Sequence, residues 1–589
     1  MKFVLHYIAE YKWYAILAPL FKMLEAIFEL LVPLVVAAMI DRGIINHDKR
    51  FVILMGLLLL LLAVVGMAVS ITAQYFAARA AVLSTGRMRS DVYKRIMSFS
   101  QNSLDRVGTS ALLTRITSDL NQVQGGINMT LRLFLRSPFV VAGAMIMAAL
   151  ISLRAFVLFA AVILCLSVFV AWLMRHTLPM YNTVQKKLEG LMVLVRENLE
   201  GIRVIRAFTG EEQERKAFFS RNEGLYEVAM TAGGWQSMLN PVTFVMVNFA
   251  VVILLYYSGR AVYVGSLTTG ETVALYNYMC QILVELVKFA TLIVQITRAW
   301  ACVGRVSDLM SMVPDERVQH NPAEATASAA ANAAPEAPAI RFRSVNFSYP
   351  SNNKPKAPTP DSDQSSARKA INDLSFSVAA GEMLGIIGGT GSGKSTIGGL
   401  LRHAYDINDG SIELFGRPVN EMTDASIAGI CAYVPQRSQL FTGTVEDNLR
   451  LGAREASRDD LINSLKIAQA YDFVMEKGGL AASVAKGGTN FSGGQRQRLC
   501  IARALAAASR ILVLDDATSA LDAATERQLI SELKSIKDLT IIVIAQRTMS
   551  VQSADNIIVM DSGWCVESGI HEELLKHNST YCEIYEAGL

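Results

Sequence analysis

Long apolar runs alternate with polar segments in the first 300 residues of the chain, and the remainder reads as a soluble α/β protein. A helix needs about 20 mainly apolar residues to cross the roughly 30 Å hydrocarbon core of a bilayer. Six runs meet this requirement, near residues 14–40, 51–77, 134–153, 155–175, 241–263 and 273–297. The pattern therefore predicts an α-helical six-span transmembrane domain over residues 1–312.

Two segments between the spans are long, residues 79–133 and 176–240, and both are rich in lysine and arginine. Such residues accumulate in the cytoplasmic loops of membrane proteins. Both segments have few Gly or Pro breaks and an amphipathic period, as in ENLEGIRVIRAF. We expect cytoplasmic helical extensions of the spans, each turning back at a short connecting helix. From periodicity alone, helical hairpins without a mechanical role are an equal alternative.

Some charged residues fall inside the predicted spans, where each costs about 2.5–3.5 kcal/mol at the membrane centre. Glu25 and Glu29 share a helix face with Lys22 in the first span, and Glu285 lies three residues before Lys288 in the sixth. One interpretation is internal ion pairing with snorkelling toward the membrane edge. The other is that one of these glutamates lines a water-filled cavity and favours cationic or amphipathic cargo. Both remain open.

Composition narrows the class of protein. The chain is 52% hydrophobic and 18% charged, which supports a membrane protein, and its net charge of +3 gives no reason to expect a nucleic-acid partner. The seven cysteines are scattered and lack CxxC spacing, so neither a disulfide framework nor a zinc site is expected. Residues 313–339 are rich in Pro, Ala and Glu and predict a flexible linker, while the polar stretch 351–368 predicts an exposed loop.

Residues 340–589 contain a phosphate-binding motif, GGTGSGKST, between an apolar strand and a helix. In this context backbone N–H groups approach phosphates at the positive end of the helix. We expect Lys394 to neutralise the β and γ phosphates of ATP and the Ser395 hydroxyl to hold Mg²⁺. The ATP-binding residues predicted here are Gly388, Gly389, Thr390, Gly391, Ser392, Gly393, Lys394, Ser395 and Thr396.

Two further motifs narrow the class of ATPase. The apolar strand ILVLDD, residues 511–516, ends in acid and is expected to present Asp515 to the metal. The sequence FSGGQRQR, residues 491–498, comes shortly before it. This second motif matches the signature of ABC (ATP-binding cassette) transporters, and the order of elements along the whole chain resembles theirs. The resemblance implies an α/β P-loop nucleotide-binding domain after the membrane domain.

The same resemblance implies roles for further residues. Tyr349 in FSYP corresponds to the aromatic residue that stacks on adenine, and Gln436 in YVPQ to the glutamine that senses Mg²⁺ and water. Residues 519–522 look like the D-loop. Two such domains sandwich two ATP molecules, each between one chain's phosphate loop and the other chain's signature. The signature residues that serve the partner's nucleotide are Ser492, Gly493, Gly494 and Gln495, and the Mg²⁺ set is Ser395, Gln436 and Asp515.

The chain departs from this family at two positions used in hydrolysis. Asp516 occupies the place of the glutamate that acts on the attacking water, and Gln546 that of a histidine near the carboxyl end. Aspartate withdraws the carboxylate by about 1.5 Å, and errors of about 1 Å can lower a rate on the order of 100-fold. Glutamine cannot become a cation near neutral pH. We therefore expect ATP binding with slow hydrolysis at this site.

The combination resembles the degenerate-site subunit of heterodimeric bacterial multidrug exporters. It implies ATP-dependent export of hydrophobic or amphipathic compounds across a bacterial inner membrane, with the ATP-binding domain in the cytoplasm. The implied partners are the lipid bilayer, the small-molecule cargo and a second half-transporter that carries the catalytic Glu and His. Export of lipid or peptide, and an ATP-gated channel or regulatory subunit, are the alternatives.

Overall fold

The computed structural model describes residues 2–312, 337–349 and 369–588 of the 589-residue chain. The predicted loop at 351–368 and most of the predicted linker lie outside the described residues. The chain divides into two compact units, one formed by Met1–Lys94 and Leu112–Met312, the other by Arg95–Ala111 and Val313–Leu589. Ala339, which the sequence assigned to the linker, is fully buried in the second unit, and its carbonyl accepts a hydrogen bond from Phe415 N.

The first unit is helical, as predicted. Within the described residues, six helices are long and apolar enough to span a membrane: Lys12–Ile44, Lys49–Met97, Thr109–Ile151, Leu153–Glu200, Glu211–Tyr263 and Thr269–Ser311. Five of the expected spans fall wholly inside one of these helices. The third was predicted to reach residue 153, but its helix ends at Ile151 because Ser152 adopts an extended backbone.

The helical elements before residue 312 include these long helices, or the parts of them, and the short helices between them. They are α1 (Lys2–Glu10), α2 (Lys12–Ala38), η1 (Met39–Ile44), α3 (Lys49–Met97), α4 (Gln101–Val107), α5 (Thr109–Thr114), η2 (Arg115–Asp119), α6 (Leu120–Met129), η3 (Thr130–Phe134), α7 (Arg136–Ile151), α8 (Leu153–Glu200), α9 (Ile202–Ala207), α10 (Glu211–Ser237), α11 (Leu239–Tyr263) and α12 (Thr269–Ser311).

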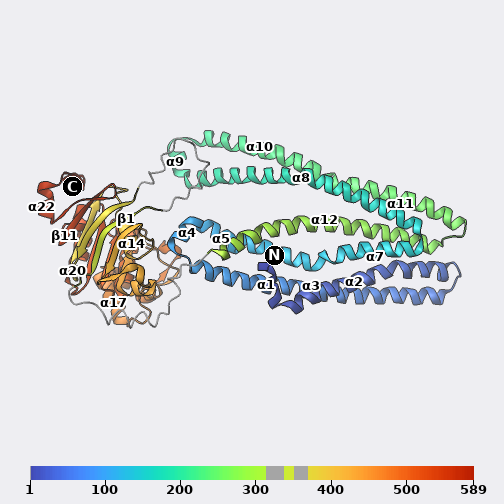
Figure 1. Cartoon of the computed structure of the whole chain (residues 1–589), viewed down its shortest axis with the longest axis horizontal. Coiled ribbons are helices and arrows are strands. Elements are labelled where there is room, and N and C mark those ends of the chain that lie inside the picture. The colour runs from blue at the N-terminus through green and yellow to red at the C-terminus, as the bar shows by residue number, and fades with distance from the viewer. Residues whose placement is uncertain (1, 313–336, 350–368, 589) are drawn as a thin grey trace. The chain divides into compact units, whose positions relative to one another are not determined.

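The helices extend well beyond a bilayer. The 49 residues of α3 correspond to about 74 Å of helix at 1.5 Å per residue, more than twice the roughly 30 Å hydrocarbon core. Helices α8 and α10 pack side by side along their length and meet at the short helix α9 (Figure 1). The predicted helical extensions and short connecting helix are therefore present in the second long loop.

The described residues of the second unit form three sheets. A six-stranded sheet has the order β12-β11-β3-β10-β9-β6, a four-stranded sheet the order β2-β1-β4-β5, and β7 pairs with β8. The strands are β1 (Ile340–Phe347), β2 (Ile371–Val378), β3 (Met383–Gly388), β4 (Asp409–Leu414), β5 (Arg417–Pro418), β6 (Cys431–Val434), β7 (Gly443–Thr444), β8 (Ser483–Val484), β9 (Ile511–Asp515), β10 (Thr540–Ala545), β11 (Asn556–Asp561) and β12 (Trp564–Gly569).

Helices cover both faces of the six-stranded sheet. They include α14 (Lys394–Leu401), α15 (Asp424–Ile430), α16 (Val445–Arg450), α17 (Arg458–Ile467), α18 (Tyr471–Glu476), α19 (Gly493–Ala506), α20 (Ala523–Ser535), α21 (Thr548–Val551), α22 (His571–His577) and α23 (Ser579–Gly588). Strands β3, β9 and β10 are buried throughout, as expected for parallel strands enclosed on both faces. Their carboxyl ends lie at one edge, which brings the end of β3 and Asp515 close together.

Candidate functional site

The loop between β3 and α14 has the backbone that its glycines permit. Gly391 and Gly393 have φ angles of 84° and 96°, in the left-handed region that favours glycine. A Cβ added at Gly388 would lie 2.1 Å from the carbonyl oxygen of Met560. The loop therefore needs glycine at these places to wrap closely over the end of the sheet.

Lys394 is 7% exposed at the start of α14. Its ammonium donates hydrogen bonds to the carbonyl oxygens of Gly388 at 2.7 Å and Gly389 at 2.6 Å. Burial lowers the pKa of Lys394, and the carboxylates of Asp516 and Asp515 act in the opposite direction. A buried cation at the amino end of a helix is a suitable partner for a phosphate.

Ser395 and Asp515 are in direct contact. The Ser395 hydroxyl donates a 2.9 Å hydrogen bond to Asp515 Oδ1, and Tyr433 Oη donates a 2.7 Å hydrogen bond to Asp515 Oδ2. Asp515 is buried at the end of β9. A hydroxyl and a carboxylate are the hard oxygen donors that Mg²⁺ prefers, so this pair fits the metal. Tyr433 was not recognised from the sequence.

Gln436 and Asp516 also lie together, because Gln436 Nε2 donates a 3.0 Å hydrogen bond to Asp516 Oδ2. Asp516 has a φ angle of 49°, and its N–H donates to the carbonyl of Ile544 at 2.8 Å. Aspartate is one of the residues that tolerate this left-handed conformation. Gln546 is exposed and follows directly after β10, the strand that pairs with β9.

Tyr349 stands beside the phosphate loop. Its hydroxyl forms a 3.0 Å hydrogen bond with Thr396 Oγ1, and its ring makes an edge contact of 5.2 Å between centroids with Tyr405. The residue is 48% exposed. A large aromatic surface next to the phosphate loop is therefore accessible to a planar base.

The signature residues begin helix α19. Ser492 Oγ accepts a hydrogen bond from Gln495 N, and Gln495 Oε1 accepts one from Ser492 N, so the two residues form a capping box. A Cβ added at Gly494 would lie 2.9 Å from the carbonyl oxygen of Ala520. Glycine is needed here because the predicted D-loop approaches the start of the helix closely.

Gln497, which the sequence did not single out, joins this helix to the predicted D-loop. Its Nε2 donates to Ser519 Oγ at 3.2 Å, and its Oε1 accepts from Ala520 N at 2.9 Å. Ser519 Oγ in turn donates to the carbonyl oxygen of Asp516 at 2.9 Å. A continuous chain of hydrogen bonds therefore connects the signature helix to Asp516.

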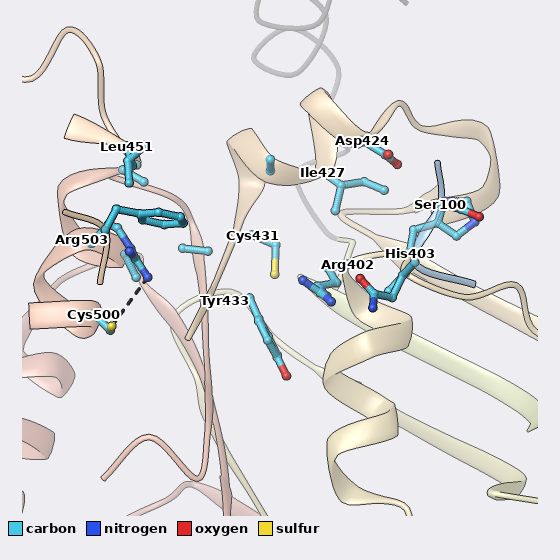
Figure 2. A pocket seen from close by; sticks show the side chains of 18 of the residues that line it. Ser100, Arg402, His403, Asp424, Ile427, Cys431, Tyr433, Leu451, Cys500 and Arg503 are labelled. Atoms are coloured by element: carbon cyan, nitrogen blue, oxygen red, sulfur yellow. Dashed lines mark hydrogen bonds between the residues drawn. The ribbon is translucent and has the colours of Figure 1, made fainter. Parts of the chain in front are cut away.

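A groove of about 590 Å³ opens in the second unit (Figure 2). It is lined by Arg402, Tyr433 and Arg503, and by Phe99, Ser100 and Gln101 from the middle of the first long loop, residues 79–133. Nearby, Tyr405 Oη donates a 2.7 Å hydrogen bond to Asp105 Oδ2 on α4. The middle of this loop, Arg95–Ala111, thus belongs structurally to the second unit.

The three glutamates predicted for the cargo cavity are all ion-paired in the first unit. Lys22 contacts Glu25 at 2.5 Å, and Arg136 contacts both Glu29 at 2.5 Å and Glu285 at 2.6 Å. Lys288 also contacts Glu285, at 3.0 Å. Arg136 was not predicted as their partner, although its position inside the span expected near residues 134–153 was the available signal.

Comparisons with known proteins agree with this architecture. Residues 15–286 match the family model of the ABC transporter transmembrane region, and residues 371–519 match the ABC transporter model. The chain is 31% identical to the ABC transporter ATP-binding protein YfiB of Bacillus subtilis over 588 residues, covering 100% of this chain and 98% of that protein.

Two further similarities extend the comparison. The chain is 30% identical to the ATP-dependent lipid A-core flippase of Photobacterium profundum, covering 85% of this chain and 82% of the flippase. A solved structure of a bacterial Atm1-family ABC exporter with ATP bound aligns with a TM-score of 0.74 at 24% identity, covering 98% of both chains. This likeness shows a common fold for the whole chain.

Proposed function

The chain belongs to the ABC transporter family, as a multi-pass membrane exporter with an ATPase cassette in the cytoplasm, and we propose that it is the degenerate-site half of a heterodimer. In this proposal the site built on its own phosphate loop binds Mg²⁺ and ATP but turns over slowly. Its signature completes a second site, where the partner supplies the catalytic Glu and His. The exported cargo is a hydrophobic or amphipathic compound.

The observation that carries the proposal is the placement of Asp516 directly after the metal aspartate. Its carboxylate accepts a hydrogen bond from the side-chain amide of Gln436, and its backbone N–H donates one to the carbonyl oxygen of Ile544. A side chain one methylene shorter than glutamate, and held in this way, is poorly placed to activate water. Gln546 adds no cationic group at the second position.

The ATP-binding and signature elements support a division of labour rather than a general loss of function. Lys394, Ser395 and Asp515 converge on one edge of the sheet. In our proposal Mg²⁺ held by Ser395, Asp515 and Gln436 would neutralise phosphate charge there. Ser492 and Gln495 retain a complete capping box at the start of α19, which leaves that helix end able to contact a partner's phosphate.

Exposed apolar residues at the tip of the second long loop also support pairing with a second chain. Phe208 is 82% exposed and Val204 is 61% exposed, and both lie at or beside α9, outside the apolar spans. Exposed apolar side chains grouped in this way fit contact with another protein surface. We assign this contact to the partner half-transporter.

The paired charges in the membrane unit support cargo that is not selected mainly by positive charge. The network contains three basic residues, Lys22, Arg136 and Lys288, and three acidic ones, Glu25, Glu29 and Glu285. Because each carboxylate has a basic neighbour, little negative charge is left to attract a cation. Hydrophobic and amphipathic molecules are the class that fits.

Lipid is the second candidate cargo, because the similar proteins include ATP-dependent lipid A-core flippases at 30% and 28% identity. Transport assays in vesicles that contain both half-transporters distinguish drug-like cargo from lipid cargo. Transport of hydrophobic dyes without movement of a fluorescent phospholipid supports drug-like cargo, and the reverse result supports lipid. Peptide export and an ATP-gated channel would give neither signal.

The experiment for the proposed division of labour restores the missing groups. In a pair whose partner carries Gln in place of its catalytic glutamate, Asp516→Glu with Gln546→His should raise ATP hydrolysis on the order of 100-fold. Asp516→Asn with Gln546→His is the matched control and should stay inactive. If the pair with the silenced partner already hydrolyses ATP at the wild-type rate, the site on this chain is not degenerate.

A further inference from the structure

Tyr433 reaches the metal aspartate from a neighbouring strand. Strand β6 pairs in parallel with β9, and Tyr433 lies opposite Val513 in the register. Side chains two residues apart share one face of a strand, so Asp515 lies on the same face as Val513. From there Tyr433 Oη donates a 2.7 Å hydrogen bond to Asp515 Oδ2.

The ring of Tyr433 is held by contacts with helix α14 and with Arg402. A Cβ added at Gly398 on α14 would lie only 2.8 Å from Tyr433 Cε2, so the ring rests against the backbone of the helix that follows the phosphate loop. The guanidinium carbon of Arg402 lies 4.9 Å from the ring centroid, a cation–π distance. The helix and Arg402 together leave the ring little freedom to move.

The two oxygens of Asp515 therefore have separate partners. Oδ1 accepts from Ser395 and Oδ2 accepts from Tyr433. A phenol carries its proton at neutral pH, so the Tyr433 hydroxyl is the donor in this hydrogen bond. A donor to one carboxylate oxygen fixes the direction in which the other oxygen faces a metal.

Tyr433 also lines the groove to which the middle of the first long loop contributes (Figure 2). In Figure 2 its ring extends from the groove wall and its hydroxyl points away from the other labelled residues. Arg402, which lies over the ring, lines the same groove. One hydrogen bond thus separates the groove from the metal aspartate.

We propose that Tyr433 is a positioning residue for the Mg²⁺ site, holding Asp515 through its hydroxyl while its ring forms part of the groove wall. This inference rests on the proposed Mg²⁺–ATP site built on the same chain. Removing the hydroxyl should weaken metal binding in the presence of nucleotide and should leave metal-free nucleotide binding unchanged. A purely structural tyrosine would change neither, or would change both through loss of stability.

The test uses the full-length chain in nanodiscs, with Mn²⁺ as the probe and a non-hydrolysable ATP analogue. Free Mn²⁺ is followed by electron paramagnetic resonance, and nucleotide binding in EDTA is followed separately. For Tyr433→Phe we expect the Mn²⁺ dissociation constant to rise about 10-fold, with less than a twofold change of nucleotide affinity in EDTA.

Tyr581→Phe is the matched control. Tyr581 is fully buried in the same unit, and its hydroxyl forms a hydrogen bond of the same 2.7 Å length with His571 Nδ1. This variant should bind Mn²⁺ as the wild type does, with a comparable change in thermal midpoint.

The outcomes separate the two levels of the proposal. If wild-type chain with nucleotide does not bind Mn²⁺, the proposed metal site fails and the role of Tyr433 fails with it. If wild type binds and Tyr433→Phe binds within twofold, only the role of Tyr433 is overturned. An equal loss in Tyr433→Phe and Tyr581→Phe would also overturn that role, because it would trace the loss to stability.

Discussion

Gln436 and Asp516 are joined by a 3.0 Å hydrogen bond from the glutamine amide to the aspartate carboxylate. The two residues are 80 positions apart in the chain. We expect Gln436 to sense metal and water, and we propose that Asp516 stands where the family has its catalytic glutamate. The bond engages one of the two carboxylate oxygens of Asp516, which supports the slow turnover that we propose for this site.

The first prediction concerns nucleotide affinity. Lys394→Ala should weaken ATP binding at this chain's own site about 10- to 100-fold, because a charge-assisted hydrogen bond contributes about 1.5–3 kcal/mol. Transport by the pair should fall only partly. Titration with a fluorescent ATP analogue measures the affinity. Lys466→Ala, at an exposed lysine on α17, is the control. Unchanged affinity in Lys394→Ala would show that the phosphates bind elsewhere.

The second prediction concerns the signature. An added Cβ at Gly494 would meet the carbonyl oxygen of Ala520 at 2.9 Å, so Gly494→Ala should push the start of α19 away from the D-loop. The rate of ATP hydrolysis by this chain together with its partner half-transporter should fall at least about 10-fold, because a displacement of about 1 Å lowers a catalytic rate by at least this factor. ATP affinity at this chain's phosphate loop should not change.

Gly429→Ala is the control for the signature variant, because an added Cβ there meets nothing within 4 Å. Steady-state ATPase activity and nucleotide affinity are measured on the same preparations. Full activity in Gly494→Ala would mean that this chain's signature does not serve the hydrolytic site.

The third prediction concerns the charge network of the membrane unit. Arg136→Leu leaves Glu285 buried without its closest cation, which typically costs about 3–5 kcal/mol. The thermal midpoint in nanodiscs should therefore drop clearly. The double variant Arg136→Leu with Glu285→Leu should recover much of the loss, because the buried carboxylate is then removed together with its partner.

Arg215→Leu removes an exposed ion pair with Glu212 and serves as the control, with an expected effect below about 1 kcal/mol. The alternative, that these glutamates line a water-filled cargo cavity, predicts another result. Arg136→Leu would then leave the thermal midpoint unchanged and alter which dyes are transported.

Local patterns in the sequence predicted much of this fold. The spans follow from apolar run length, and the phosphate loop follows from glycines whose backbone angles the structure displays at Gly391 and Gly393. These features depend on neighbours in the chain, which a sequence shows directly. The convergence of Ser395 on Asp515 could be expected because Asp515 ends one strand of a parallel sheet and Ser395 comes after another.

Pairings between distant segments could not be predicted in the same way. Arg136 meets Glu29 and Glu285 across 107 and 149 residues, and Tyr433 meets Asp515 across 82. Which face of one helix meets another, and which strands are neighbours, depends on packing of the whole unit. The sequence shows that a charge inside a span needs a partner, but the fold selects that partner.

The central claim is tested most directly by Asp516→Ala. ATP hydrolysis is measured for the full-length chain alone and for the chain paired with the half-transporter encoded beside it. We predict little activity for the chain alone, high activity for the pair, and less than a twofold loss in the pair carrying Asp516→Ala. The account is contradicted if the chain alone forms a dimer with full turnover that Asp516→Ala abolishes.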